Sequence, residues 1–205
     1  MNYIFDLDGT IIDSSERLYR LFQRLVPESS FTKEQYWNLK RKKINHETIL
    51  NSFFPEHNFS DFEIKWMKMI ENPEYLEMDQ NYPDTIDVLN ELVKMHSLIL
   101  LTARQSKNNL LAELQRLNIR DFFSLILVTE STSTKDELLC YAEKEYFRKG
   151  DNDLFVSDMG KDIIVGKRHG YRTIAITHGF MNSKQLSLYE PDLIIDRLSQ
   201  ILLIQ

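Results

Sequence analysis

Two carboxylates directly after an apolar run near the N-terminus constrain this chain more than any other feature. Residues 3–5 form the apolar run, and Asp6, Leu7, Asp8 and Gly9 follow it. Such a run predicts a buried strand, and Gly9 permits the chain to turn sharply where the strand ends. Asp6 and Asp8 are two residues apart, so in extended backbone their side chains leave the same face. The sequence therefore predicts two acids that face one small volume.

Charge repulsion between Asp6 and Asp8 requires compensation if both are buried. Two like charges about 4 Å apart repel by about 4 kcal/mol at an effective dielectric constant near 20. The pair therefore indicates a bound cation, a shared proton, or both. The alternative is an ordinary turn between a strand and a loop, with both side chains in water.

The segment from Phe5 to Ser14, FDLDGTIIDS, resembles the first motif of the haloacid dehalogenase-like hydrolase superfamily, whose phosphatase members carry DxDGT after the first strand. The resemblance implies a Mg²⁺-dependent phosphohydrolase with an aspartyl-phosphate intermediate on Asp6. It implies that Asp8 is first the general acid and then the general base, and that its backbone carbonyl binds the metal. We expect the neighbouring carboxylate to raise the pKa of Asp8. We also expect Gly9 to contact the substrate phosphate.

Beyond Pro83, helical patterns alternate with apolar strands. The expected strands are residues 97–101, 124–128, 154–157, 173–176 and 193–195, with helices at residues 83–95, 107–117 and 134–147 among them. This alternation predicts an α/β fold, a Rossmann-like three-layer α/β/α core with a parallel sheet. Ligands of such sheets bind beyond the carboxyl ends of the strands, where the polar residues of this chain are found.

Residues 14–80 have a different composition, dense in aromatic residues and without a convincing strand. They predict a small all-helical unit that begins with Asp13 as an N-cap, and the resemblance implies a cap domain inserted after strand 1. The expected domains are a core of residues 1–13 and 81–205 and a cap of residues 14–80. The basic run Lys40–Lys43 is interpreted as a solvated face or as a surface that attracts anionic substrates.

Thr102 ends an apolar strand and is followed by Ala103 and Arg104. This arrangement resembles the second superfamily motif, which implies that Thr102 donates its hydroxyl to a phosphate oxygen and that Ala103 also contacts the phosphate. The alternative is that Thr102 caps the next helix. Arg104 either reaches the substrate or lies on the surface, and the surface position is favoured.

A lysine is expected because a phosphate dianion beside several carboxylates needs more than one divalent cation for charge balance. Lys135 opens a predicted helix and resembles the third motif, although the proline often found near this lysine is missing. Lys161 is the alternative. Asp158 and Asp162 follow the strand at residues 154–157 and resemble the fourth motif, which implies that they bind Mg²⁺ with Asp6 and Asp8. A helix that begins with acidic residues is the alternative for Asp162.

The formal net charge of −6 gives no general attraction to nucleic acid or to anionic membranes. The solitary Cys140 fits a reducing compartment, and no apolar run approaches membrane length, so a cytoplasmic location is expected. The five histidines show no paired metal-ligand spacing and are interpreted as structural or surface residues. One of them, His178, follows a predicted strand end together with Gly179.

Together these features predict a phosphomonoesterase that acts on a small phosphorylated metabolite. The alternatives are a phosphomutase or phosphotransferase of the same superfamily, and a non-catalytic phosphate-binding regulatory domain. A dehalogenase of the superfamily works without a metal and commonly lacks an acid at the position of Asp8, so Asp8 favours phosphate chemistry. The identity of the substrate and the oligomeric state stay open.

Overall fold

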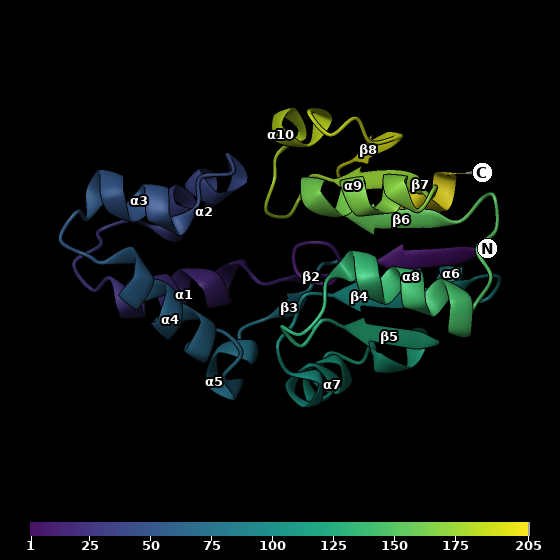
Figure 1. Ribbon diagram of the computed structural model, residues 1–205, viewed down its shortest axis with the longest axis horizontal. Helices are drawn as coiled ribbons and strands as arrows, with labels where there is room; N and C mark the ends of the chain where they lie inside the picture. Colours follow the sequence, from purple (N-terminus) through teal and green to yellow (C-terminus); the bar gives the residue numbers. More distant parts are fainter. Residues whose placement is uncertain (205) are drawn as a thin grey trace.

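A six-stranded parallel sheet forms the centre of the computed structural model, which describes residues 1–204 (Figure 1). The strand order is β5-β4-β1-β6-β7-β8, and every neighbouring pair is parallel. The strands are β1 (Asn2–Phe5), β4 (Ser97–Thr102), β5 (Leu125–Val128), β6 (Leu154–Ser157), β7 (Arg172–Ile176) and β8 (Leu193–Ile195). β1 lies between β4 and β6, so the chemistry at its carboxyl end is flanked by the ends of both neighbours.

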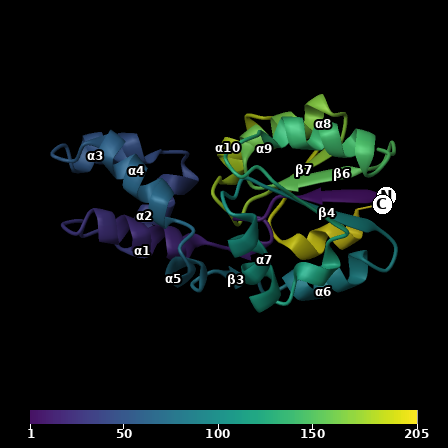
Figure 2. The same cartoon turned by 60° about the horizontal axis from the view of Figure 1, so that its bottom comes forward.

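Helices cover both faces of the sheet (Figure 2). Apolar side chains of α6 (Thr85–Leu92), α7 (Lys107–Arg116) and η2 (Leu198–Leu203) pack on one face, and those of α8 (Lys135–Glu145) on the other. α9 (Gly160–Arg168) packs beside α8, and α10 (Ser183–Ser187) and η1 (Arg120–Phe122) complete the core. The predicted three-layer α/β/α core with a parallel sheet is therefore confirmed. Within residues 1–204, no helix has the length and apolar character needed to cross a membrane.

A helical insertion, α1 to α5, lies to one side of the sheet (Figure 1). Its helices are α1 (Ser15–Leu25), α2 (Lys33–Arg41), α3 (His46–Phe53), α4 (Phe59–Met69) and α5 (Pro73–Leu76). The short strands β2 (Ile12–Asp13) and β3 (Gln80–Asn81) pair antiparallel at its base. Buried aromatic rings, among them Phe22, Tyr36 and Phe62, form a core of its own. These aromatic residues therefore form the hydrophobic core of the insertion, because a small helical unit needs large side chains to fill its interior.

Helix ends differ slightly from the sequence-based expectation. α1 begins at Ser15 with Ser14 in the N-cap position, and the Asp13 carboxylate instead accepts a hydrogen bond from the Ser15 N–H at 2.8 Å. α6 begins at Thr85 and not at Pro83, because Asp84 takes the N-cap position, and it ends at Leu92.

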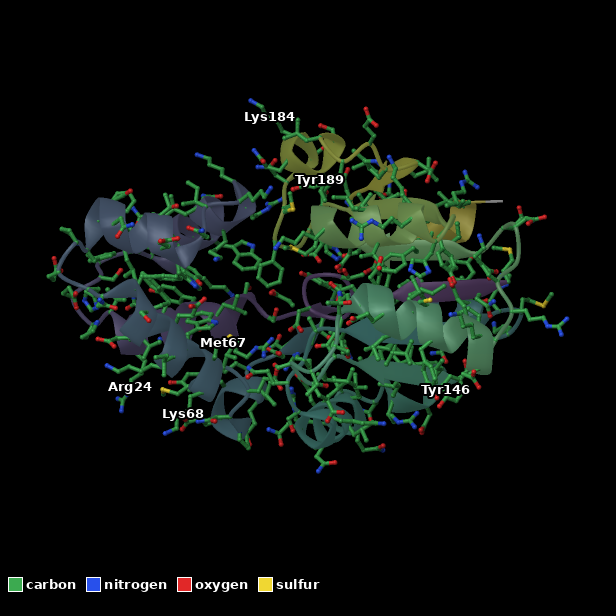
Figure 3. All side chains as sticks on the ribbon, in the orientation of Figure 1. Arg24, Met67, Lys68, Tyr146, Lys184 and Tyr189 are labelled. Carbon is green, nitrogen blue, oxygen red and sulfur yellow. The ribbon has the colours of Figure 1, made fainter. Side chains whose placement is uncertain are left out.

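The basic run Lys40–Lys43 fastens the helical insertion to the core. Arg41 donates a hydrogen bond to the backbone carbonyl of Thr177 at 2.7 Å. The Lys43 ammonium lies 2.5 Å from the hydroxyl of Tyr189, which is labelled on the core side in Figure 3. A purely solvated face is therefore the wrong interpretation of this run. A sequence pattern could not show this, because both contacts join residues more than 130 positions apart.

Gly166 allows α9 to approach the sheet closely. A Cβ atom at this position would lie 2.9 Å from side-chain atoms of Phe155 and Thr173. We expect Gly166→Val to lower the free energy of unfolding by about 1–3 kcal/mol, because overpacking forces strain into a close-packed layer. Lys167→Val, on the exposed side of the same helix, is the matched control and should cost less than about 1 kcal/mol. Urea denaturation of the two variants measures the difference, and equal losses would contradict the close-packing argument.

Candidate active site

The candidate active site lies where β1, β4 and β6 end. Asp6 directly follows β1, and its N–H donates to the carbonyl of Val156 at 3.0 Å, which holds it against β6. A cavity of about 670 Å³ opens here and is lined by Asp6, Asp8 and Thr102, among others. Asp6 is only 5% exposed. The first-strand acids and the residues after neighbouring strands therefore share one cavity, as the topology of a parallel sheet predicts.

Lys135 joins two of the acids. Its ammonium lies 2.7 Å from Asp6 Oδ1 and 2.5 Å from Asp162 Oδ2. Thr134 caps α8 and so places Lys135 in the first turn, pointing toward the strand ends. Burial would lower the pKa of Lys135, but the charges of Asp162 and Asp6 outweigh burial and raise it. Lys161, the alternative, is exposed on α9 and lines the cavity without touching these acids.

Asp158 is completely buried beneath the turn after β1. Its Oδ1 accepts a hydrogen bond from the Thr10 hydroxyl at 3.2 Å, and its Oδ2 accepts one from the Phe180 N–H at 2.6 Å. A Cβ atom would lie 2.2 Å from Asp158 Oδ2 at Gly9 and 2.1 Å from it at Gly179. The two glycines therefore leave the room that this carboxylate occupies. Burial and the charges of Asp6 and Asp162 raise its pKa well above the usual value.

Thr102 presents a hydroxyl without a partner. Its Oγ1 is buried and has no hydrogen-bond partner among residues 1–204, although the side chain lines the cavity beside Ala103. The alternative role as a helix cap is wrong, because the hydroxyl of Ser106 caps α7 by accepting from the Asn109 N–H at 3.2 Å. A buried hydroxyl without a partner costs free energy, so the site is suited to a ligand that accepts this hydrogen bond.

Asp8 is held by two arginines. Arg104 approaches it with two nitrogens, at 2.7 Å from Oδ2 and 2.9 Å from Oδ1, and Arg17 of α1 forms a second ion pair with Oδ1. Burial would raise the pKa of Asp8, but Arg104 and Arg17 lower it to about 2. The expectation that a neighbouring carboxylate raises this pKa is therefore wrong for this arrangement. The expected surface position of Arg104 is also wrong, because the residue is only 4% exposed.

The same arginines contact two further buried acids that sequence reasoning missed. Arg17 lies 3.1 Å from Asp79, and Arg104 lies 3.2 Å from Asp79 and 3.0 Å from Glu113. Burial raises the pKa of Asp79 to about 9, although the charge of Arg17 acts in the opposite direction. The sequence held one signal for the burial of Glu113. This residue lies on α7 beside the buried Leu114 and three residues after the buried Leu110, and therefore on the apolar face of the helix.

The acids at the strand ends suit a divalent cation. Asp6, Asp158 and Asp162 offer oxygen ligands of the kind that Mg²⁺ prefers. If all three were ionised beside the Lys135 ammonium, they would leave a net charge of −2, but burial and the like charges raise the pKa of Asp158 well above its usual value. Burial and the charge of Asp162 raise the pKa of Asp6 to about 7 in spite of Lys135. A bound divalent cation would relieve this repulsion, and carboxylate oxygens suit Mg²⁺, although in the part of the chain that the structure describes the ligand atoms of Asp6, Asp158 and Asp162 do not all lie within 4.8 Å of one another.

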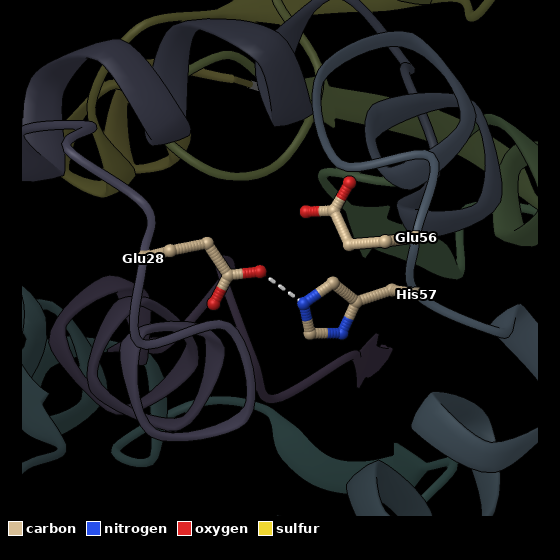
Figure 4. Close-up of side chains that lie close together, drawn as sticks. All are labelled: Glu28, Glu56 and His57. Atoms are coloured by element: carbon tan, nitrogen blue, oxygen red, sulfur yellow. Dashed lines mark hydrogen bonds and ion pairs between the residues drawn. The ribbon is translucent and has the colours of Figure 1, made fainter.

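A second group of acids lies on the helical insertion, far along the chain from these residues. Glu28, Glu56 and His57 meet there, and within residues 1–204 their ligand atoms come within 4.8 Å of one another (Figure 4). His57 forms a close ion pair with Glu28. This pair joins the loop before α4 to the loop after α1, which agrees with a structural role for His57. His178 is also structural, since its ring stacks on Tyr82 with centroids 3.7 Å apart.

Comparison with known proteins places the chain in a family. The profile of the haloacid dehalogenase-like hydrolases matches residues 3–176. Pyrophosphatase PpaX of Bacillus mycoides (strain KBAB4) is 24% identical over 206 residues, covering 97% of this chain and 94% of the relative.

Solved structures share the fold at low identity. A haloacid dehalogenase-like family protein of Streptococcus pneumoniae superposes with a TM-score of 0.79 at 21% identity, covering 98% of this chain and 96% of that one. YfnB of Bacillus subtilis, determined bound to magnesium, gives a TM-score of 0.69 at 20% identity, covering 99% and 97%. The family match spans most of the chain and agrees with the motif after β1, so this protein belongs to the haloacid dehalogenase-like hydrolase family.

Proposed function

We propose that the protein is a Mg²⁺-dependent phosphomonoesterase that acts on a small phosphorylated metabolite through an aspartyl-phosphate at Asp6. One observation carries the proposal. A buried carboxylate at the end of β1, bonded to Lys135 at 2.7 Å, shares a cavity with the unpartnered hydroxyl of Thr102. A nucleophile, a cation and a free hydrogen-bond donor are the groups that transfer of a phosphoryl group requires.

In the first step, a carboxylate oxygen of Asp6 attacks phosphorus and the bond from phosphorus to the leaving oxygen breaks. Thr102 donates a hydrogen bond to a phosphoryl oxygen, and the backbone around Gly9 and Ala103 contacts the same group. Lys135 offsets negative charge at the phosphoryl oxygens while it keeps Asp6 oriented. In the second step, water attacks phosphorus and Asp6 is released as a carboxylate.

Mg²⁺ would be held by the carboxylates of Asp6, Asp158 and Asp162 and by the backbone carbonyl of Asp8. When bound, it supplies positive charge that stabilises the transferring phosphoryl group. The buried position of Asp158 keeps its carboxylate fixed, since both of its oxygens already accept hydrogen bonds.

Asp8 serves the two steps in different protonation states. As the ion-paired carboxylate, it can accept the proton of the attacking water in the second step. To donate a proton to the leaving oxygen in the first step, it must first leave Arg17 and Arg104, because they hold its pKa near 2. Arg17 belongs to α1, so a displacement of the helical insertion would remove one of the two arginines. We therefore propose that residues 14–80 act as a cap over the site and residues 1–13 and 81–205 as the core.

The similarity to pyrophosphatase PpaX makes pyrophosphate a further candidate substrate. The test is release of inorganic phosphate with Mg²⁺ from sugar phosphates, nucleotides, phosphoglycolate and pyrophosphate. We expect release from at least one of them and none when EDTA removes the metal. Conversion of glucose 1-phosphate to glucose 6-phosphate without release would favour a mutase. No turnover across the panel would favour a non-catalytic phosphate-binding domain.

Gly179 gives a local test of the metal site. In Gly179→Ala, the new Cβ would lie 2.1 Å from Asp158 Oδ2 and 2.3 Å from the carbonyl oxygen of Gly9, so the carboxylate must move. We expect the affinity for Mg²⁺, measured by calorimetry, to fall by about 10- to 100-fold, as when the support of a metal ligand is lost. Gly150→Ala is the control, because its Cβ meets no atom closer than 3.4 Å. Unchanged Mg²⁺ affinity in Gly179→Ala would count against Asp158 as a ligand.

A further inference from the structure

A second cavity continues the candidate active site toward the helical insertion. It has a volume of about 500 Å³ and is lined by Lys40 and Trp66 of the insertion and by residues of the core. Met159, Lys161 and Phe180 line both this cavity and the one that contains Asp6. A ligand whose phosphoryl group lies at Asp6 can therefore extend past these three residues toward α2.

The lining of this second cavity is basic. It includes Lys40, Lys43 and Lys161, and no acidic side chain among residues 1–204 lines it. Lys43 is engaged with the hydroxyl of Tyr189. His46 lies on the same wall, but its Nε2 is 2.9 Å from the hydroxyl of Tyr36. Lys40 and Lys161 are thus the cations that face this space without a partner on the protein.

Lys40 is the informative one of the two. The side chain is half-buried, and within residues 1–204 it has neither a hydrogen bond nor an ion pair. Burial alone lowers its pKa to about 8. An ammonium group withdrawn from water without a counter-charge is unfavourable, and buried cations are normally paired. An anion in the cavity would supply the missing partner.

We propose that the substrate carries a second anionic group, a phosphate or a carboxylate, which Lys40 and Lys161 bind in this second cavity while the transferred phosphoryl group lies at Asp6. This inference rests on the proposed function and narrows its substrate class. The charge distribution supports it, since Asp6 and Asp162 line the first cavity and, among residues 1–204, no acidic side chain lines the second. A second anion is thereby drawn toward the insertion and away from the carboxylates.

The test compares matched phosphonates, which bind without being cleaved. One series has a carboxylate and the other a hydroxyl at the end of alkyl phosphonates of increasing length, beginning with phosphonoacetate and 2-hydroxyethylphosphonate. Binding to the full-length protein is measured by calorimetry with Mg²⁺ present. A methylene bisphosphonate shows whether a phosphonate serves better than a carboxylate as the second group.

At the best chain length, we expect the wild type to bind the carboxylate at least about tenfold more tightly than its hydroxyl counterpart, as for a charge-assisted hydrogen bond in a sheltered site. Lys40→Met should abolish this preference, and Lys161→Met should reduce it. Both should leave the affinity for the hydroxyl ligand within about threefold, which also shows that the variants are folded. Lys42→Met, an exposed neighbour that lines neither cavity, should keep the full preference.

A wild type that binds both series equally, or binds neither, would overturn the inference, as would a preference that survives in Lys40→Met. The proposed phosphatase function is tested by a different result, the release of phosphate. If the wild type releases phosphate with Mg²⁺ and yet shows no preference for a second anion, only the narrower substrate class is wrong.

Discussion

Asp6→Asn is expected to lower phosphate release by at least about 10³-fold, because an amide cannot attack phosphorus and the covalent intermediate is lost. The loss should appear in kcat, since Thr102 and Lys135 still bind the phosphoryl group. Steady-state kinetics with Mg²⁺ on the best substrate of the panel measures it. A variant that keeps a tenth or more of the wild-type kcat would exclude Asp6 as the nucleophile.

The same variant should fold normally. Asp6 shares Lys135 with Asp162, and burial together with the charge of Asp162 raises the pKa of Asp6 to about 7. Replacing it with a neutral amide removes repulsion from Asp158 and Asp162, so the melting temperature without metal should stay equal or rise. A lower melting temperature would show that the loss of activity reflects damage to the fold.

Arg104→Met is expected to lower the free energy of unfolding by about 3–5 kcal/mol. Removal of one partner from a buried ion cluster leaves the other charges uncompensated, and Arg104 contacts Asp8, Asp79 and Glu113 at once. Urea denaturation at pH 7 measures the loss. Arg20→Met removes a solvent-exposed ion pair with Glu16 and is the matched control, with an expected cost below about 1 kcal/mol.

The pH dependence of this loss has a definite sign. In the wild type, the pKa of Asp8 is depressed to about 2, so the stability that its ion pairs supply is present above about pH 4 and is lost as the pH falls toward 2. Without Arg104 this pKa rises, and the acid protonates more readily. The deficit of the variant should therefore be largest near neutral pH and shrink on acidification. A deficit that stays constant as the pH falls from 8 to about 2 would show that Arg104 acts by packing alone.

The sheet and the acids at its edge could be predicted from sequence for a simple reason. An apolar strand that ends in a polar residue places that residue at the carboxyl edge, whatever the rest of the chain does. Asp6 and Asp158 directly follow β1 and β6, and Thr102 is the last residue of β4. The sequence favours Lys135 over Lys161 only by resemblance to the third motif, because the contacts of either lysine depend on the direction in which α8 and α9 project their first turns.

The ion cluster around Asp8 could not be predicted, because the residues that join it come from separate parts of the chain. They are Arg17, Asp79, Arg104 and Glu113. Arg17 and Arg104 stand where a charged residue is usually solvated, and Asp79 lies in a polar stretch before β3. Their burial follows from the docking of α1 and α7 around Asp8, which no local pattern encodes. The contacts of the basic run Lys40–Lys43 with the core could not be predicted for the same reason.

Direct detection of the covalent intermediate tests the central claim most closely. The enzyme is mixed with Mg²⁺ and substrate, denatured during turnover and treated with borohydride, which reduces an acyl phosphate on an aspartate to homoserine. Peptide mass spectrometry then locates the modified residue. We expect homoserine at position 6, and only when both substrate and Mg²⁺ were present. Homoserine at position 8, or no modification while phosphate is being released, would contradict the claim.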